Sequence, residues 1–255
     1  MPLKVGLLGF GRTGSVVAKE ISKDPGLSLQ WVCRKSVDEN HPFASHLLGY
    51  HDDFAPFVAI ENLDEQFLNN SPVDLIIDFS SNCTSAVYEK IAHTGVRIVS
   101  AISNYEPHEL ERLNKASKKT AVLYSPNITL GINWLMMASK MLKRIIPHAD
   151  IEVVEEHFRA KKDISGTALK LAKHLDLNAK EHVNSIRVGG IVGKHEVIFG
   201  LPNQTIRLVH ESINRAAFGT GAIFAAKWLK DKKSGLYSME NVLQETFLKE
   251  LNSAT

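Results

Sequence analysis

The chain has 255 residues, 44% of them hydrophobic and 23% charged, and its formal net charge is +2. This composition is ordinary for a globular protein of one large or two modest domains. The small charge argues against nucleic acid as a partner, and no apolar run is long enough to cross a bilayer. Cys33 and Cys83 are the only cysteines, which excludes a disulfide framework or a cysteine-rich zinc site and favours the reducing cytoplasm.

The first predicted element is a buried strand over residues 3–8, and so early a strand leads us to expect no signal peptide. The strand runs into Gly9-Phe10-Gly11-Arg12-Thr13-Gly14, and a helix is expected over residues 15–22. A G-x-G-x-x-G sequence between a strand and a helix is typical of a dinucleotide site. Its glycines allow a tight turn, the approach of a pyrophosphate and close packing of helix on strand. The alternative interpretation is a tight turn that binds no dinucleotide.

The end of the second predicted strand, residues 27–33, bears on the choice of cofactor. An acidic residue at this point would bind the free ribose 2′-hydroxyl of NAD. The chain has Cys33-Arg34-Lys35 instead, and two cations suit a 2′-phosphate better than a hydroxyl. The pair Arg34 and Lys35 therefore favours NADPH, with NADH as the alternative cofactor and a solvated basic pair as the alternative interpretation.

Strands and helices then alternate, with strands predicted over 73–79, 96–100 and 120–124 and helices over 84–94 and 107–119. This alternation predicts an α/β fold with a doubly wound, Rossmann-type parallel sheet. Cofactors bind beyond the carboxyl ends of such strands, so further candidate cofactor residues lie there. They are Phe79, Ser80, Ala101 and Ser103, together with Ser125 and Asn127 in the turn that ends this region.

The rest of the chain is richer in strands and predicts a smaller α+β domain with a mixed or antiparallel sheet. A long helix is expected over residues 131–146, and two more helices over 218–229 and 238–251, with a polar turn at 230–235. The predicted strands between them cover residues 151–157, 182–187, 190–199 and 204–210.

The stretch from Glu155 to Ala168 links a strand to a helix expected over residues 167–175. It places His157, Arg159, Lys161 and Lys162 just before Ser165-Gly166-Thr167, where backbone N–H groups point out of the helix end. Such an end attracts anions, and cationic side chains strengthen the attraction. We therefore expect a pocket for a small carboxylate beside a proton donor; the alternative is a solvated charged loop before an ordinary capped helix.

These motifs together resemble the dihydrodipicolinate (4-hydroxy-tetrahydrodipicolinate) reductase family of lysine biosynthesis over nearly the whole chain. The most specific segment is E-x-H…K…D…S-G-T-A, and the glycine fingerprint is the least specific. The resemblance extends over Asp78-Phe79-Ser80, residues 127–133, 155–168, 185–199, 215–222 and 234–237.

The resemblance implies an NAD(P)H-dependent reductase that acts on a cyclic imine dicarboxylate. Independently of the resemblance, no cluster of histidine, cysteine and carboxylate residues has metal-ligand spacing, so we predict no catalytic metal. His157 and Lys161 match the histidine and lysine that could act as the general acid, and Ser165, Gly166 and Thr167 match the carboxylate-binding turn. Arg159 joins this turn as a candidate substrate ligand. The family also implies a homotetramer built through the second-domain sheet. The expected domains are residues 1–128 with 216–255 for the dinucleotide, and residues 129–215 for substrate and oligomerisation.

Three departures from the family pattern keep other functions open. Phe158 stands in place of a second histidine, Ile164 replaces Ala-Pro, and Ser100-Ala101-Ile102-Ser103 replaces G-T-T-G, which puts a β-branched side chain near the cofactor. One alternative is a reductase or dehydrogenase of a different imine or amino acid. Another is a non-catalytic NADPH-binding regulatory protein, which would need no proton donor.

Overall fold

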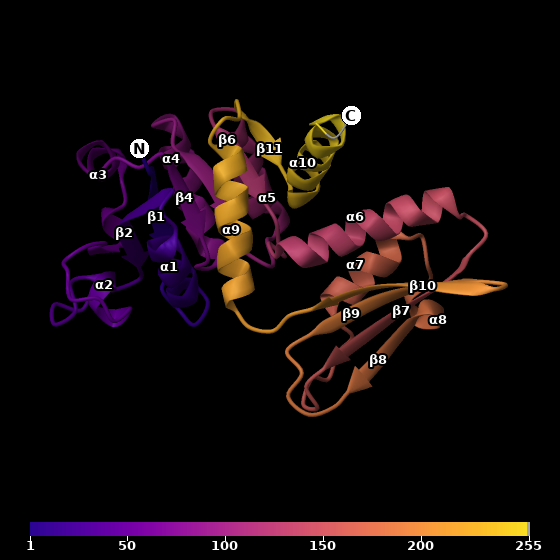
Figure 1. The fold of residues 1–255 in the computed structure, drawn as a ribbon. Helices are drawn as coiled ribbons and strands as arrows, with labels where there is room; N and C mark the ends of the chain where they lie inside the picture. The colour runs from indigo at the N-terminus through magenta and orange to yellow at the C-terminus, as the bar shows by residue number, and fades with distance from the viewer. Residues whose placement is uncertain (254–255) are drawn as a thin grey trace. The chain divides into compact units, whose positions relative to one another are not determined.

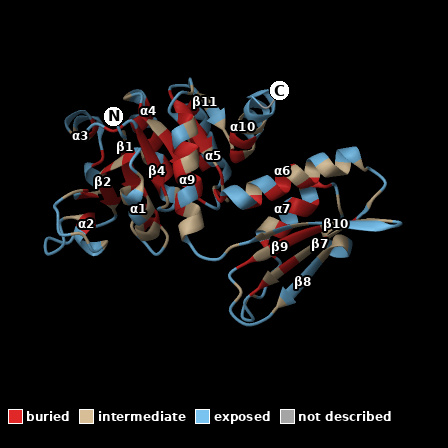
Figure 2. Cartoon of the chain, viewed as in Figure 1, coloured by how far each residue is buried: buried red, intermediate tan, exposed pale blue. Residues whose placement is uncertain are grey.

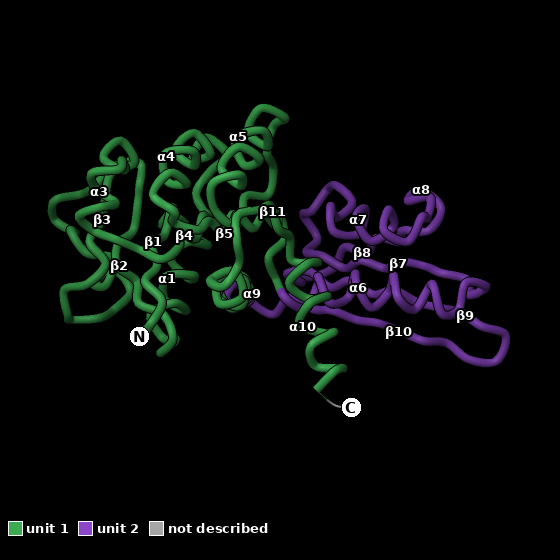
Figure 3. The backbone as a smooth tube through the Cα atoms, turned by 90° about the horizontal axis from the view of Figure 1, so that it is seen from above, with its two compact units in different colours: residues 1–129, 218–255 green, residues 130–217 purple. Residues whose placement is uncertain are grey.

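The computed structural model of the protein describes residues 1–253. It divides into two compact units, Met1–Thr129 with Phe218–Thr255, and Leu130–Ala217 (Figure 3). Among the described helices none has the length and apolar character that crossing a membrane requires.

The first unit is built on a seven-stranded parallel sheet in the order β11-β6-β5-β4-β1-β2-β3 (Figure 1). Buried apolar side chains on both faces of its central strands explain the parallel arrangement, because helices cover both faces. Chain order reverses between β1 and β4, and doubly wound folds bind cofactors beyond the strand ends at such a point. The strands are β1 (Leu3–Leu8), β2 (Leu27–Arg34), β3 (Phe57–Ala59), β4 (Leu75–Asp78), β5 (Arg97–Ser100), β6 (Ala121–Tyr124) and β11 (Gly235–Tyr237).

Two separate apolar clusters lie in the first unit. One contains Val17 of α1 and Ala222 of α9, and the other contains Ile91 of α4 and Leu113 of α5. Figure 2 shows how far the residues of these helices and of the strands are buried. The helices are α1 (Gly14–Lys23), α2 (Ala44–Leu47), α3 (Glu65–Asn70), α4 (Tyr88–His93), α5 (Pro107–Ser117), α9 (Ala216–Leu229) and α10 (Met239–Ser253), with 3₁₀ turns η1 (Ile60–Asn62) and η2 (Asn82–Val87).

The second unit is a mixed four-stranded sheet in the order β10-β9-β7-β8, with β7 parallel to β8 and antiparallel to β9. Helices α6 and α7 pack on one face, where Ile151, Val153, Val197 and Phe199 meet Leu171 and other apolar side chains of the helices. Its elements are α6 (Leu130–Ile145), β7 (Asp150–His157), α7 (Gly166–His174), α8 (Ala179–His182), β8 (Val183–Arg187), β9 (Lys194–Leu201) and β10 (Gln204–Glu211).

The structure confirms the predicted doubly wound parallel sheet and the second, mixed sheet, and it corrects several details. Residues 190–193 were expected to begin a strand, but the chain turns at Gly189-Gly190 and continues without regular structure to β9, because two of these four residues are glycines. The helix expected over residues 84–94 is a 3₁₀ turn followed by the short α4. Strand β11 follows the predicted polar turn and was not anticipated, since three residues carry no readable alternation.

Candidate active site

The glycine-rich turn between β1 and α1 requires its glycines. Gly9 has φ +93°, and a side chain there would meet the backbone of Ser80 at 2.7 Å. A side chain on Gly14 would lie 2.2 Å from the carbonyl oxygen of Gly9. Nothing lies within 4 Å of the equivalent position on Gly11, so a ligand can approach the backbone there.

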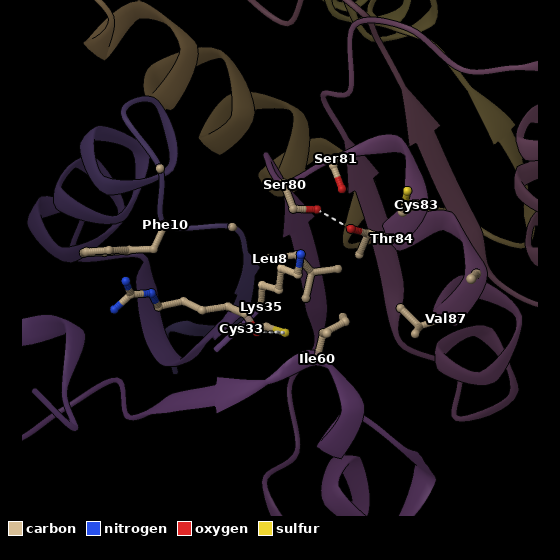
Figure 4. A pocket seen from close by; sticks show the side chains of 14 residues that line it. Leu8, Phe10, Cys33, Lys35, Ile60, Ser80, Ser81, Cys83, Thr84 and Val87 are labelled. Atoms are coloured by element: carbon tan, nitrogen blue, oxygen red, sulfur yellow. Dashed lines mark hydrogen bonds between the residues drawn. The ribbon is translucent and has the colours of Figure 1, made fainter. Parts of the chain in front are cut away.

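A pocket of about 620 Å³ opens beside this turn (Figure 4). The glycine turn, the end of β2 and the segment after β4 all contribute to its walls. Six predicted cofactor residues line it, namely Gly9, Phe10, Gly11, Arg34, Lys35 and Ser80. Eight others do not, namely Arg12, Thr13, Gly14, Phe79, Ala101, Ser103, Ser125 and Asn127. The sequence reasoning missed Leu8, Cys33, Ile60, Ser81, Cys83, Thr84, Ala86 and Val87.

Aromatic rings contact one of the two cationic residues that line the pocket. The Arg34 guanidinium lies over the ring of Phe57 at 4.6 Å, and Phe10 meets the same ring edge-on at 5.0 Å. Lys35 is exposed. A cation–π contact of this kind limits the orientations of the guanidinium and leaves its N–H edge available to an anion. The apolar walls and the two cations therefore fit a nucleotide that carries phosphate.

The buried carboxyl of Asp78, the last residue of β4, begins a hydrogen-bond network that extends to Ser100 at the end of β5. Its oxygens accept hydrogen bonds from the backbone N–H and hydroxyl of Ser80 at 2.8 and 2.5 Å and from Tyr88 at 2.6 Å. The hydroxyls of Tyr88, Tyr105 and Ser100 continue the network at 3.0 and 2.8 Å. Burial raises the pKa of Asp78 to about 6 even though these hydrogen bonds oppose the rise. The network sets the position of Ser80 in the pocket wall.

Two of the predicted cofactor residues outside the pocket, Ser125 and Asn127, support a turn of the first unit. The Ser125 hydroxyl donates to the Asn127 carbonyl at 2.6 Å, and the Asn127 side-chain oxygen accepts from the N–H and hydroxyl of Thr129 at 3.2 and 2.9 Å. Ile102, which the sequence placed near the cofactor, is buried, while Ser103 is exposed.

Of the two predicted catalytic residues, His157 is the last residue of β7 in the second unit and Lys161 lies in the loop that follows. Alternation along the strand puts Glu155 and His157 on the helix-covered face, the same face as Ile151 and Val153. The register across the sheet places His195 of β9 opposite Glu155. On the other side of β7, strand β8 contributes a further set of neighbours: Ser185 pairs with Glu155 and Arg187 with His157.

Glu155 is fully buried and accepts hydrogen bonds from several elements. The hydroxyl of Ser185 donates at 2.7 Å, and the two terminal nitrogens of Arg187 donate at 3.0 and 2.5 Å. Nδ1 of His157 makes a short contact with Oε2 of the same carboxylate. Burial alone would raise the pKa of Glu155, but these partners lower it to about 2. The carboxylate is therefore ionised at neutral pH.

The predicted carboxylate-binding turn stands at the start of α7, and its residues differ in burial and in hydrogen bonding. Ser165 is buried; its hydroxyl accepts from the N–H of Thr167 at 3.2 Å and contacts Nε2 of His195 at 2.8 Å, while its N–H donates to Glu155 at 3.3 Å. Gly166 is exposed, and nothing lies within 4 Å of its would-be side chain. Ser165 thus holds the turn together, while Gly166 is open to solvent and Thr167 is half-buried.

The three cationic residues of the loop before α7 differ in how far they are exposed. Arg159 and Lys162 are exposed and Lys161 is half-buried. The N–H of Arg159 donates to Gly189 at 3.1 Å and that of Lys161 to Phe158 at 3.1 Å, which fixes the loop backbone. The ring of His195 lies 5.3 Å from that of His157, and desolvation, followed by the charge of His157, lowers the pKa of His195 to about 4. His195 is therefore neutral at pH 7.

Sequence reasoning missed the roles of Glu155, Ser185, Arg187 and His195 in this cluster. A signal for Glu155 was present, because residues two apart on a strand share a face. For the others no local signal existed, since the register between strands brings them to Glu155.

The sequence and the fold were compared with those of known proteins. The chain is 30% identical over 262 residues to the 4-hydroxy-tetrahydrodipicolinate reductase of Buchnera aphidicola subsp. Cinara cedri, covering 92% of this chain and 94% of that protein. It is 37% identical over 187 residues to that of Rickettsia bellii, covering 65% of this chain and 74% of the relative.

The fold is shared with a solved structure, dipicolinate-bound dihydrodipicolinate reductase from Paenisporosarcina sp. TG-14. The TM-score is 0.77 at 20% identity over 94% of this chain and 99% of that one. The family model described as dihydrodipicolinate reductase, N-terminus, matches residues 3–128, and the model described as dihydrodipicolinate reductase, C-terminus, matches residues 131–243. Since the two models together match most of its length, the chain belongs to the dihydrodipicolinate reductase family.

Proposed function

We propose that this chain catalyses the NAD(P)H-dependent reduction of 4-hydroxy-tetrahydrodipicolinate (dihydrodipicolinate) to tetrahydrodipicolinate in lysine and diaminopimelate biosynthesis. Membership of the family over both units supports the proposal. The structural observation that carries it is the second-unit cluster, where an imidazole and a lysine stand beside the open end of a helix that begins at Gly166. A regulatory protein would have no use for such a proton donor.

The first unit supplies the cofactor half of the proposed chemistry. Gly11 offers its backbone to the pyrophosphate, the aromatic and aliphatic walls of the pocket suit an adenosine, and Arg34 and Lys35 supply positive charge. A bound nicotinamide cofactor supplies the hydride.

The second unit supplies the substrate half. A cyclic dicarboxylate needs donors for its carboxylate oxygens, and Gly166 and Thr167 at the start of α7 provide them, with Arg159 and Lys162 adding positive charge. The dipicolinate-bound relative supports a ligand of this class. Reduction adds a proton as well as a hydride, and His157 or Lys161 gives that proton to the ring.

NADPH is the preferred cofactor in this proposal. The guanidinium of Arg34 is held over Phe57 and can form a charge-assisted bond with a 2′-phosphate that NADH lacks. Arg34→Ala should weaken NADPH binding by about ten- to a hundred-fold, because such bonds contribute roughly 1.5–3 kcal/mol, and should change NADH binding little. Calorimetry with both cofactors measures this, with exposed Lys230→Ala as the control. Equal losses for both cofactors would contradict the assignment.

Consumption of NADPH with enzymatically generated 4-hydroxy-tetrahydrodipicolinate tests the reaction itself. The wild type should turn over, and Lys161→Ala should lower kcat by about a hundred-fold or more with NADPH affinity unchanged, if this lysine is the acid. His157→Ala is the parallel variant, and comparison of the two identifies the donor. Tight NADPH binding without turnover of this or any other imine would make the chain a sensor instead.

A further inference from the structure

We propose that Glu155 is the positioning residue of the reduction site, an ionised carboxylate that holds Nδ1–H of His157 and the backbone N–H of Ser165 at the same time. One buried group would thereby fix the proton donor and the carboxylate-binding turn in a single geometry. The inference rests on the proposed function, because it takes His157 as a group at the reacting centre and residues 166–167 as the anion site.

The two oxygens of Glu155 are shared among three elements. Oε1 accepts from the N–H of Ser165 at 3.3 Å, the hydroxyl of Ser185 at 2.7 Å and Nη2 of Arg187 at 2.5 Å. Oε2 accepts from Nη1 of Arg187 at 3.0 Å and faces Nδ1 of His157. Because the side chain has no exposed surface, these donors replace water completely. Each oxygen therefore serves a strand β8 partner and one residue of the candidate site.

The charge on Glu155 decides which nitrogen of His157 carries the proton. Burial would raise the pKa of this carboxyl, but Arg187, Ser185 and the other donors lower it to about 2, so it only accepts hydrogen bonds at neutral pH. The neutral imidazole must then carry its proton on Nδ1. Nε2 is left as the atom that takes up and releases a proton. It lies next to Gly193, where an added Cβ atom would be 3.0 Å from Nε2.

The other charged and titratable groups around His157 agree with this assignment. On β9, His195 has a pKa of about 4, lowered first by desolvation, so it stays neutral and cannot compete as the acid. Its cross-strand neighbour on β10 is His210, whose pKa burial also lowers. Arg187 on β8 is already engaged by Glu155, and Lys161 lies in the loop.

A purely structural ion pair between Glu155 and Arg187 is the competing interpretation. That pair alone would stabilise the sheet but would leave the protonation of His157 and the α7 turn unaffected. The experiment therefore measures quantities that a change in stability alone leaves unchanged. These are the tautomer of His157, the pH profile of the reaction and the affinity for dipicolinate, a pyridine dicarboxylate.

The test variant is Glu155→Gln in the full chain, which removes the charge and keeps the shape. We expect the alkaline limb of the kcat/KM profile to move to lower pH by one unit or more, because the carboxylate no longer stabilises the imidazolium. Calorimetric affinity for dipicolinate should fall about tenfold as the Ser165 turn loosens. NADPH affinity, which belongs to the other unit, should stay within about twofold.

Glu152→Gln is the matched control. Glu152 lies on the same strand three residues earlier, on the opposite face, and its Oε1 is 2.9 Å from Nδ1 of His182. It therefore also carries a glutamate–histidine contact, but outside the cluster. This control should leave the pH profile and the dipicolinate affinity unchanged.

A measurement on the wild type covers the case in which Glu155→Gln does not fold. Nitrogen-15 chemical shifts of His157 should show the neutral ring protonated on Nδ1. A predominant Nε2–H tautomer, or an active Glu155→Gln with an unmoved profile and unchanged dipicolinate binding, would overturn the role of Glu155. Failure of the proposed function would look different, since the wild type would then neither bind dipicolinate nor consume NADPH, whatever its tautomer.

Discussion

Two buried carboxyl groups in this protein, Asp78 and Glu155, have pKa values shifted in opposite directions, and their donors explain the difference. The partners of Asp78 are a backbone N–H and the hydroxyls of Ser80 and Tyr88, all neutral, so burial dominates and raises its pKa to about 6. Glu155 has the guanidinium of Arg187 as well as Ser185, which outweigh burial and lower its pKa to about 2. A full positive charge is what stabilises a buried carboxylate.

Asp78→Asn should remove a pH dependence of stability. The folded chain binds the Asp78 proton more tightly than the unfolded chain, so this group stabilises most below its ordinary pKa of 3.8, and the contribution is lost as pH rises through 6. Relative to wild type, the variant should therefore gain about 2 kcal/mol in unfolding free energy between pH 4 and 7.5. Urea unfolding at both pH values measures this. Exposed Asp74→Asn is the control, and a constant difference between Asp78→Asn and wild type would refute the prediction.

Phe158, which stands where the family has a second histidine, lies just beyond the last residue of β7. Continued strand alternation would turn Phe158 away from the face of His157, but the strand ends at His157, and Phe158 is 43% exposed in the chain. A phenyl ring cannot bind a carboxylate, so we expect a neighbouring cation, Arg159, Lys161 or Lys162, to replace the histidine.

Phe158→His should accordingly leave turnover of 4-hydroxy-tetrahydrodipicolinate within a few-fold of wild type. The unfolding free energy should change by no more than about 0.5 kcal/mol, as for other surface positions. Steady-state kinetics and urea unfolding give both numbers. A wild type that barely reduces this substrate, together with restored activity in Phe158→His, would instead make Phe158 a specificity switch and give the chain a different substrate.

At the scale of one element, α7 joins the candidate anion site to the core of the second unit. Ser165 and Thr167 begin the helix, while Leu171 on its inner face is fully buried among side chains of α6, β7 and β9. Leu169, on the outer face, is 43% exposed. Packing of the inner face therefore fixes where the N-terminus of the helix points.

Leu171→Ala should lower the unfolding free energy of the second unit by about 2–5 kcal/mol, because the cavity left behind adds to the lost burial. It should also weaken dipicolinate binding while NADPH binding is kept. Leu169→Ala on the same helix is the matched control and should cost less than about 1 kcal/mol. Equal losses from the two variants, measured by urea unfolding, would show that α7 is not held by its inner face.

At the scale of the whole molecule, the sheet of the second unit has one face that α6 and α7 leave uncovered. Val209 of β10 points there, opposite Glu196 of β9 and away from the helix-covered face that His195 shares, and it is 52% exposed. Val192 and Ile213, in the segments flanking β9 and β10, are also exposed. Exposed apolar side chains in one region favour association, which agrees with the expected homotetramer.

If the chain assembles as the expected homotetramer, Val209→Asp should dissociate it into smaller species with unchanged circular dichroism, because a buried unpaired charge is costly at an interface. Light scattering across a concentration series measures the mass. Leu248→Asp, an exposed leucine on α10 of the first unit, should leave the mass unchanged. A wild-type chain that is monomeric at all concentrations would rule out assembly.

Local sequence alone determined the backbone of both candidate sites. The glycines of residues 9–14 specify a turn that other residues cannot adopt, alternation along residues 151–157 specifies a strand, and Ser165 specifies where α7 begins. These features depend on backbone dihedrals and on spacing along one segment, and both can be read from a single stretch of chain.

Tertiary structure alone decided which side chains meet. Arg187 and Ser185 reach Glu155 from 32 and 30 residues away, and the register of β8 against β7 selects them. Likewise, the register of β9 places His195 opposite Glu155, and the packing of α4 brings Tyr88 to Asp78. Register and packing depend on the burial of whole sheet faces, so no local pattern contains them. For the same reason the charge states of both carboxyls became known only from the fold.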